Sequence, residues 1–287
     1  MVSTLNDLYL EARRALMVQE DSQTAGQLAR SLLCYAADKT IEQVIADRQM
    51  YASQACCDKM QDAVSRVLNG EPLAYVIGKW EFYGLPLEVD RRVLIPRDDT
   101  CAVTELAIKQ ALFLSTGPRI LDLCTGSGCI GLAIASRVKD AKVTLGDISK
   151  DALAVAKKNI TNLKLSARVS CVQTSALDEP SSFLGKFDLI VSNPPYITGS
   201  EMETLDRSVK DFEPHLALFG GEDGLDFYRA IASNYKKALK PGGYLCFEFG
   251  MGQGEDVCRI LEENGYTILE RSRDNNEIER AVIARYE

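Results

Sequence analysis

The sequence is poor in histidine and has no paired-cysteine metal motif. His215 is the only histidine among 287 residues, so neither a Cys-His zinc site nor a Ser-His-Asp triad has its usual groups. The nine cysteines lie in apolar surroundings or in the adjacent pair Cys56-Cys57, and no two of them form a C-x-x-C. We therefore predict reduced, mostly buried thiols and no metal site.

Long apolar runs and clusters of positive charge are also absent. No stretch approaches the roughly 20 apolar residues of a membrane span, and the first 20 residues carry Asp7, Glu11, Arg13 and Arg14, unlike the core of a signal peptide. The net charge of −8 argues against a general duplex-binding surface, which needs clustered Lys and Arg. We expect a cytoplasmic monomer with no membrane contact and no direct sequence-specific binding of nucleic acid.

Apolar periodicity divides the chain into three parts. Residues 1–70 repeat apolar side chains at helical spacing in four segments, which predicts a helical N-terminal domain, either a packed cap or a docking surface. Between residues 71 and 97 the spacing alternates, beginning with Leu73, Tyr75 and Ile77. This pattern predicts a β-hairpin that links the two domains.

Residues 98–287 alternate apolar strands with amphipathic helices. The expected helices are 101–114, 129–138, 149–163, 225–239 and 254–264, and the expected strands are 119–123, 142–145, 168–172, 187–192, 244–249, 266–271 and 278–284. Such alternation predicts an α/β fold with a mostly parallel seven-stranded sheet covered on both faces. The last two strands should form a hairpin, so the sheet needs one antiparallel strand, the last in the chain.

A glycine turn follows the first strand of this region. Gly126 and Gly128 allow the backbone to approach a ligand closely, and the helix that begins at Cys129 offers free N–H groups. About twenty residues downstream, Asp147 ends the next strand, where an acid can accept both hydroxyls of a ribose. These features fit a dinucleotide-binding fold, and they fit equally an enzyme that binds another adenosine compound.

The loop Asn193-Pro194-Pro195-Tyr196 separates these alternatives. It ends an apolar strand and presents one amide oxygen and a row of carbonyls, suited to accepting hydrogen bonds from a planar NH₂ group. The tetrapeptide has no use in a dehydrogenase but is typical of amino-methylating enzymes that use S-adenosylmethionine. We expect the Asn193 side chain and the Pro194 carbonyl to hold the acceptor amide and Tyr196 to stack on it.

The chain resembles the peptide chain release factor glutamine methyltransferases of the HemK type over nearly its whole length. The motifs that carry the resemblance are Gly70 to Tyr75, Glu81 to Gly84, Leu94 to Arg97, the glycine turn, Asn193 to Tyr196, Phe212 to Pro214 and Gly220 to Leu225. The resemblance implies a Rossmann-like methyltransferase fold, S-adenosylmethionine as cofactor, and methylation of the glutamine nitrogen in the Gly-Gly-Gln loop of a release factor.

The resemblance also implies site residues. The cofactor-binding residues would be Asp122, Cys124, Thr125, Gly126, Ser127, Gly128, Asp147, Ala176 and Asn193, and the substrate-binding residues Asn193, Pro194, Pro195 and Tyr196. The chain departs from the family pattern at four positions. Cys124 stands where the family usually has glycine, which a small side chain pointing into the core should tolerate. Asp98 and Cys101 replace a usual proline and a usual glutamate, so no function is carried onto them. Ser175 replaces a common aspartate, and backbone groups near Ala176 would take its place in recognising the adenine amine.

Other functions share parts of this pattern. Enzymes that methylate the N6 amine of adenine in DNA use the same tetrapeptide, but they must flip a base and hold phosphates, and this acidic chain has no basic stretch. A sister enzyme that methylates a glutamine of a ribosomal protein stays open. A non-catalytic binding module is the remaining alternative, and Gly126, Gly128, Asp147 and Asn193 argue against it.

Overall fold

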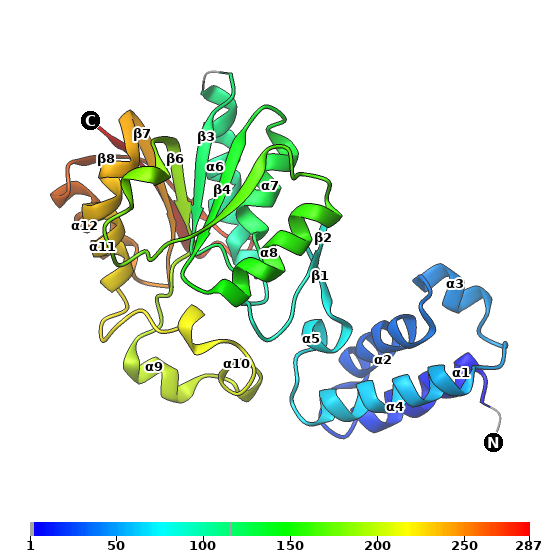
Figure 1. Cartoon of the computed structure of the whole chain (residues 1–287). Coiled ribbons are helices and arrows are strands. Elements are labelled where there is room, and N and C mark those ends of the chain that lie inside the picture. Colours follow the sequence, from blue (N-terminus) through cyan, green and yellow to red (C-terminus); the bar gives the residue numbers. More distant parts are fainter. Residues whose placement is uncertain (1–2, 115) are drawn as a thin grey trace. The chain divides into compact units, whose positions relative to one another are not determined.

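A computed structural model describes residues 3–114 and 116–287 (Figure 1). Residue contacts divide the chain into two units. The helical unit extends to Gly78 and includes the short segment Arg207–Phe212, and the sheet unit contains Lys79–Asp206 and Glu213–Glu287. Residues 1 and 2 of the predicted N-terminal domain lie outside the described residues. No helix in the described part of the chain is long and apolar enough to cross a membrane.

Side-chain caps begin the four main helices of the helical unit. The helices are α1 Leu5–Leu16, α2 Ser22–Ala37, α3 Ile41–Ala46 and α4 Gln54–Leu68, with N-caps Thr4, Asp21, Thr40 and Ser53. Each cap oxygen accepts a backbone N–H that the helix leaves unpaired. Their apolar faces form one core around Leu16, Leu32 and Leu33. The four predicted helices are therefore confirmed. The segment 207–212 adds the single turn α10 Arg207–Lys210.

The predicted hairpin is shorter than expected. Residues Leu73–Ile77 form the helix α5, which follows Pro72 and ends at Gly78 with a φ of 76°. The prediction was wrong here because a five-residue run is too short to separate alternation from one helical turn: Ala74, Tyr75 and Val76 are all buried. The hairpin consists of β1 Lys79–Phe82 and β2 Leu85–Glu88, paired antiparallel.

The sheet unit is built on seven strands in the order β5-β4-β3-β6-β7-β9-β8. Their bounds are β3 Arg119–Leu123, β4 Lys142–Asp147, β5 Val169–Gln173, β6 Phe187–Ser192, β7 Leu239–Glu248, β8 Tyr266–Arg273 and β9 Glu279–Tyr286. The first five strands in this order run parallel, and β9 is antiparallel to both of its neighbours. The predicted mostly parallel sheet with an antiparallel last strand is confirmed.

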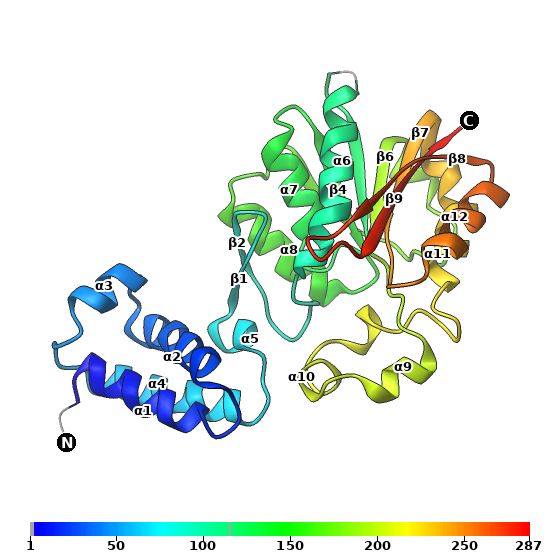
Figure 2. The same cartoon turned by 180° about the vertical axis from the view of Figure 1, so that it is seen from behind.

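Helices cover both faces of the sheet (Figures 1 and 2). The helices α6 Cys101–Phe113, α7 Cys129–Arg137 and α8 Lys150–Asn162 contribute to one buried apolar cluster, and α11 Asp226–Asn234 and α12 Gly254–Glu263 contribute to the other. Alternate strand residues feed the two clusters, as Ile120 and Leu121 do. This arrangement follows from strands that are apolar on both sides.

Two segments differ from their predictions. The helix expected over 225–239 ends at Asn234 and continues as the 3₁₀ turn η4 Tyr235–Ala238. The strand expected over 244–249 begins earlier, because residues 239–243 also belong to β7, where the pairing with β6 is irregular. The long insertion after β6 contains the short helix α9 Gly199–Thr204 and the 3₁₀ turn η3 His215–Ala217. The remaining 3₁₀ turns are η1 Asp98–Thr100 and η2 Ser182–Leu184.

Strand register brings three chain segments to one edge of the sheet. Leu123 of β3 pairs with Gly146 of β4 on one side and with Ser192 of β6 on the other. The residues that end or follow these strands, Cys124, Asp147 and Asn193, therefore leave the sheet next to one another. In an open parallel sheet, this carboxyl edge is where ligands bind.

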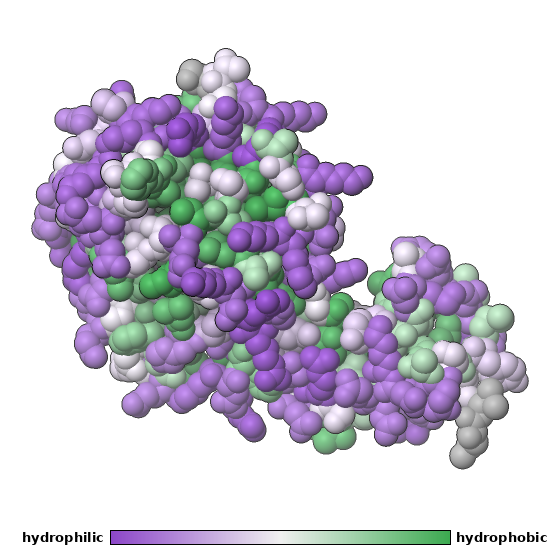
Figure 3. All heavy atoms as spheres, viewed as in Figure 1, coloured by the Kyte–Doolittle hydropathy of each residue, from purple (hydrophilic) through white to green (hydrophobic). Residues whose placement is uncertain are grey.

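The surface of the sheet unit has an apolar area with polar side chains around it. In the space-filling view, apolar side chains show at the centre of a hollowed face of the sheet unit, and polar side chains surround them (Figure 3).

All nine cysteines are free thiols, six of them partly exposed and three buried.

Candidate active site

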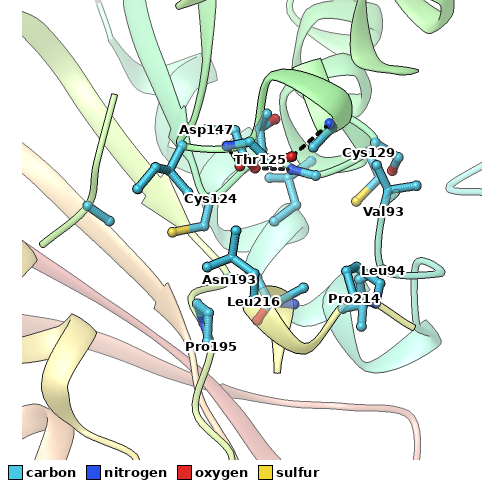
Figure 4. A pocket seen from close by; sticks show the side chains of 18 of the residues that line it. Val93, Leu94, Cys124, Thr125, Cys129, Asp147, Asn193, Pro195, Pro214 and Leu216 are labelled. Atoms are coloured by element: carbon cyan, nitrogen blue, oxygen red, sulfur yellow. Dashed lines mark hydrogen bonds between the residues drawn. The ribbon is translucent and has the colours of Figure 1, made fainter. Parts of the chain in front are cut away.

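A cavity opens at the carboxyl edge of β3, β4 and β6 (Figure 4). The glycine turn from Cys124 to Ser127, Asp147 and Asn193 line it, together with residues 92–94 and 174–177. Pro214 and Leu216 from the insertion also line it. The cavity thus joins the glycine turn, the strand-end acid and the Asn-Pro-Pro-Tyr loop, which the sequence predicted separately.

The glycine turn is held from behind by Asp122. Its Oδ2 accepts hydrogen bonds from the Thr125 hydroxyl at 2.6 Å and from the Gly131 amide at 2.9 Å. Asp122 is fully buried, and its Oδ1 has no hydrogen-bond partner in the described part of the chain. Gly126 and Gly128 have φ of 55° and 86°, a region that glycine enters at little cost. This anchored turn leaves the N-terminus of α7 open towards the cavity.

Cys124 has a left-handed backbone, with φ of 60°. A residue with a Cβ pays about 1 kcal/mol or more for this conformation, which gives a physical reason for glycine at this position in the related family. Its side chain packs against the second core cluster and also lines the cavity, on the side of Asn193 (Figure 4). It is thus accommodated between core and cavity. Burial raises the pKa of the thiol, which therefore stays protonated.

Asp147 presents its carboxylate at the end of β4. Its Oδ2 accepts the Gly126 amide at 2.9 Å and its Oδ1 accepts the Ser149 amide at 2.9 Å. Burial raises the pKa of Asp147, and these backbone hydrogen bonds oppose the rise. A carboxylate has about four acceptor positions, so both oxygens can accept a further hydroxyl proton. This is the arrangement that a ribose diol requires.

Residues after β5 form a less polar side of the cavity. Ala176 and Leu177 line it together with Ile148. The Ser175 hydroxyl accepts the Leu177 amide at 3.2 Å, and the Ser175 carbonyl accepts the Tyr235 hydroxyl at 2.7 Å. Ser175 is therefore engaged by the protein itself, and apolar contact dominates this part of the cavity.

The Asn-Pro-Pro-Tyr loop lies at the cavity, where Asn193 and Pro195 contribute to its lining. The Asn193 Nδ2 donates to the Thr100 hydroxyl at 3.3 Å. In the described part of the chain, no donor occupies the Asn193 Oδ1 or the Pro194 carbonyl. The Tyr196 ring packs against the second core cluster, and burial raises the pKa of its hydroxyl. The Asn193 Oδ1 and the Pro194 carbonyl are thus unoccupied, but Pro194 and Tyr196, both predicted site residues, do not belong to the cavity lining.

The insertion braces this loop, which sequence reasoning did not foresee. Ile197 pairs with Phe219, and the Gly220 amide donates to the Ile197 carbonyl at 2.9 Å. A Cβ on Gly220 would lie 2.6 Å from Cα of Tyr196. The Gln253 side chain donates to the Tyr196 carbonyl at 3.1 Å. The Gly220 to Leu225 motif, recognised only as a family pattern, therefore supports the loop by close backbone contact.

Arg97 lies beside the cavity wall. Its guanidinium forms an ion pair with Glu213, whose side chain is buried, and Glu213 also accepts the Ile95 amide at 3.3 Å. Burial raises the pKa of Glu213, and Arg97 opposes the rise. The pair joins residues 92–96 to residues 214–217, which line the same cavity. In the structure, Arg97 thus ties two wall segments together.

Burial of Asp122 leads to a pH-dependent stability. Burial raises the pKa of Asp122 to about 7, Asp147 adds to the rise, and hydrogen bonds from Thr125 and Gly131 oppose it. The fold thus favours the protonated carboxyl. The stability that the protonated Asp122 carboxyl contributes is fully present below the ordinary pKa of about 4. It is lost as the pH rises through about 7.

We expect the Asp122→Asn variant to lose this dependence. Relative to it, the wild-type chain should become less stable by on the order of 2 kcal/mol between pH 5 and pH 7.5. Urea unfolding of both proteins at the two pH values measures the difference. The prediction would be contradicted if the free energy of unfolding of the wild type, minus that of Asp122→Asn, stayed constant or increased between pH 5 and pH 7.5.

The residues of the cavity fit S-adenosylmethionine. The buried Ser127 hydroxyl has no hydrogen-bond partner in the described part of the chain and lies in the lining. The N-terminus of α7 suits the carboxylate of an amino acid, Asp147 suits a ribose, and Ala176 and Leu177 suit a flat base. Among the described residues, no group of three or more His, Cys, Asp or Glu side chains is placed to hold a metal ion.

Comparison with known proteins shows which family this chain belongs to. A family model described as the methyltransferase small domain matches residues 104–222, and one described as the PrmC N-terminal domain matches residues 7–78. A release factor glutamine methyltransferase of Clostridium acetobutylicum is 40% identical over 265 residues, which cover 92% of this chain and 90% of that protein. The protein of the same name from Geobacter sulfurreducens is 42% identical over 224 residues, covering 77% and 76%.

Solved structures support the fold. A methyltransferase from Pyrococcus furiosus superposes with a TM-score of 0.51 at 18% identity, covering 78% of this chain and 98% of that one. At this identity the likeness concerns the fold alone. The seven-stranded sheet flanked by helices is thus that of the S-adenosylmethionine-dependent methyltransferases.

Proposed function

Because the chain belongs to the release factor glutamine methyltransferase family, we propose that its substrate is the glutamine of the Gly-Gly-Gln motif in a peptide chain release factor. The reaction transfers a methyl group from S-adenosylmethionine to the side-chain amide nitrogen. The observation that carries the proposal is the Asn193 side chain in the cavity lining, with the Pro194 carbonyl next to it in the chain; no donor from the described residues occupies the Asn193 Oδ1 or that carbonyl.

The chemistry follows from the amide group. An amide nitrogen is a poor nucleophile because its lone pair is delocalised into the carbonyl. In our proposal, Asn193 Oδ1 and the Pro194 carbonyl each accept one N–H of the substrate amide, which raises electron density on nitrogen and fixes its orientation. As nitrogen becomes positive during transfer, both hydrogen bonds strengthen, so they stabilise the transition state more than the bound substrate. The acidified proton then leaves to solvent.

The cofactor residues are part of the same proposal. When bound, S-adenosylmethionine supplies an electrophilic methyl group on a sulfonium centre. Asp147 would accept the ribose hydroxyls, and the turn from Cys124 to Gly128, held by Asp122, would place the N-terminus of α7 at the amino acid end. Backbone and apolar contacts around Ala176 would hold the base. Pro195 would shape the wall beside the amide, and Tyr196 would stack on it.

We further propose that the chain acts as a cytoplasmic monomer with a release factor as its protein partner. The proposed boundaries are a helical N-terminal domain over 1–70, a linker over 71–97 and a methyltransferase domain over 98–287. The family model that ends at residue 78 and the contact boundary after Gly78 both lie within the linker.

Labelled methyl transfer tests the proposal. The purified chain is incubated with labelled S-adenosylmethionine and a purified release factor, a ribosomal protein mixture or an adenine-containing DNA duplex, and the added methyl group is located by mass spectrometry. We expect one methyl group on the Gly-Gly-Gln glutamine and none when that glutamine is replaced. Methylation of only the ribosomal protein or the DNA would overturn the proposed substrate.

A further inference from the structure

Glu248 is a buried carboxyl group beside the loop that bears Asn193. It ends β7, one residue after Phe247, which pairs with Ser192 of β6, so Glu248 and Asn193 leave neighbouring strands together. Glu248 is only 2% exposed. The cavity lining includes Asn193 and Thr100 but not Glu248, so Glu248 acts behind the cavity, away from the bound ligands.

Glu248, Thr100 and Asn193 form a buried hydrogen-bonded group. The Asn193 Nδ2 donates to the Thr100 hydroxyl at 3.3 Å, and hydrogen bonding from the side chains of Thr100 and Asn193 lowers the pKa of the adjacent Glu248 carboxyl group. The Glu248 Oε2 has no hydrogen-bond partner in the described part of the chain, which leaves Oε1 as the oxygen that serves these side chains. Thr100 is 2% exposed, and its backbone carbonyl accepts a hydrogen bond from the Thr104 hydroxyl at 2.8 Å. A buried polar group of this kind costs stability unless it is hydrogen-bonded.

This arrangement determines which way the Asn193 amide faces. A side-chain amide has its two N–H donors on one side and its acceptor oxygen on the other. Thr100 and Glu248 together engage the nitrogen side. The oxygen side is therefore turned away from them, towards the cavity, where the proposed reaction needs an acceptor.

We propose that Glu248 is a positioning residue, which with Thr100 holds Asn193 so that its Oδ1 faces the acceptor amide. The inference rests on the role of Asn193 in the proposed function. Removing Glu248 frees the Asn193 side chain to rotate and to present its NH₂ group instead. An NH₂ group cannot accept a hydrogen bond from the substrate nitrogen, so methyl transfer slows while the cofactor site stays intact.

The charges around Glu248 are compatible with this role. Asp99 forms an ion pair with Arg280 at 2.9 Å, and both face Glu248, as does the Tyr196 hydroxyl. Burial raises the pKa of Glu248 to about 8, and Asp99 adds to the rise, whereas Arg280 and the hydrogen bonds oppose it. Both the protonated and the ionised carboxyl group keep an oxygen that accepts from Asn193, so the positioning works on either side of this pKa.

Two substitutions at Glu248 test the role by kinetics. Glu248→Leu removes the acceptor and should lower kcat by on the order of 10-fold to 100-fold, as when a supporting partner of a functional group is lost, with KM and Kd for S-adenosylmethionine unchanged. Glu248→Gln keeps a carbonyl oxygen and should retain most of the activity. Leu261→Ala removes a buried side chain of α12 away from this group and controls for general destabilisation, with kcat unchanged below its unfolding temperature.

The side-chain NMR signal of Asn193 gives a readout that needs no methyl transfer. The signal is assigned by its absence in Asn193→Ala. Hydrogen exchange of its NH₂ group should be slow in the wild type and in Glu248→Gln, and faster in Glu248→Leu and Thr100→Val. Slow exchange in the wild type and faster exchange in Glu248→Leu, in a protein that methylates no release factor, would support the positioning and overturn the proposed substrate. Normal kcat and slow exchange in Glu248→Leu, with Asn193→Ala inactive, would overturn the positioning alone.

Discussion

Asn193→Ala is expected to lower kcat for release factor methylation by on the order of 10²-fold to 10³-fold, about 3–4 kcal/mol, as when one oxyanion-hole donor is removed. The methyl side chain of alanine leaves one substrate N–H without its acceptor. The Pro194 carbonyl remains, so activity should fall steeply without disappearing. The loss should lie mainly in kcat because the hydrogen bond strengthens only as the nitrogen becomes positive.

Single-turnover kinetics with saturating cofactor measure this effect. Asn162→Ala is a matched control, since Asn162 lies on α8 and its exposed side chain donates a hydrogen bond to Glu88 at 2.9 Å. The control should keep wild-type turnover. Calorimetric titration of Asn193→Ala with S-adenosylmethionine should show binding, because the glycine turn and Asp147 are untouched. Wild-type turnover in Asn193→Ala would rule out the proposed mechanism.

Gly220→Ala is expected to have the second-largest effect. A Cβ at this position would lie 2.6 Å from Cα of Tyr196, 2.7 Å from the Pro195 carbonyl oxygen and 2.9 Å from the Tyr196 carbonyl carbon. Real Cβ contacts are never this short, and a backbone cannot rotate aside as a flexible side chain can. The loop must shift, and a displacement of about 1 Å in a reacting group can cost roughly 10²-fold in rate.

The matched control for this substitution is Gly199→Ala. A Cβ at Gly199 would meet only the end of the Glu222 side chain at 3.4 Å, an ordinary contact. We expect Gly199→Ala to keep normal turnover and Gly220→Ala to lose about 10²-fold in kcat, with cofactor affinity retained. Assays well below each unfolding temperature separate loop displacement from loss of fold. Equal turnover in the two variants would show that the loop tolerates the displacement.

Much of the site could be predicted because its parts follow the ends of strands that are adjacent in the sheet. The glycine turn follows β3, Asp147 ends β4 and Asn193 follows β6, and these three strands are adjacent in the sheet. Each residue stands at a recognisable break between an apolar run and a polar loop. A parallel sheet brings such breaks to one edge without any detailed knowledge of packing. The sequence therefore predicts the position of the cavity, although it does not predict which residues of the insertion line it.

The supporting residues could not be predicted in the same way. Thr100 and Asn193 are 93 positions apart, and Glu248 meets Asn193 only through the register that pairs Phe247 with Ser192. A one-residue change in that register would turn Glu248 to the other face of the sheet. Gln253 follows β7 in a glycine-rich turn that carries no periodic pattern. Contacts of this range leave no local signal in the sequence.

The brace between Ile197 and Phe219 separates two parts of the insertion. Two backbone hydrogen bonds close its base: from the Ile197 amide to the Leu218 carbonyl at 3.0 Å and from the Gly220 amide to the Ile197 carbonyl at 2.9 Å. The residues between, 198–217, form a closed loop, of which Pro214 and Leu216 line the cavity whereas residues 198–212 do not. A substitution within 198–212 can therefore change the surface of the loop without altering the cavity lining.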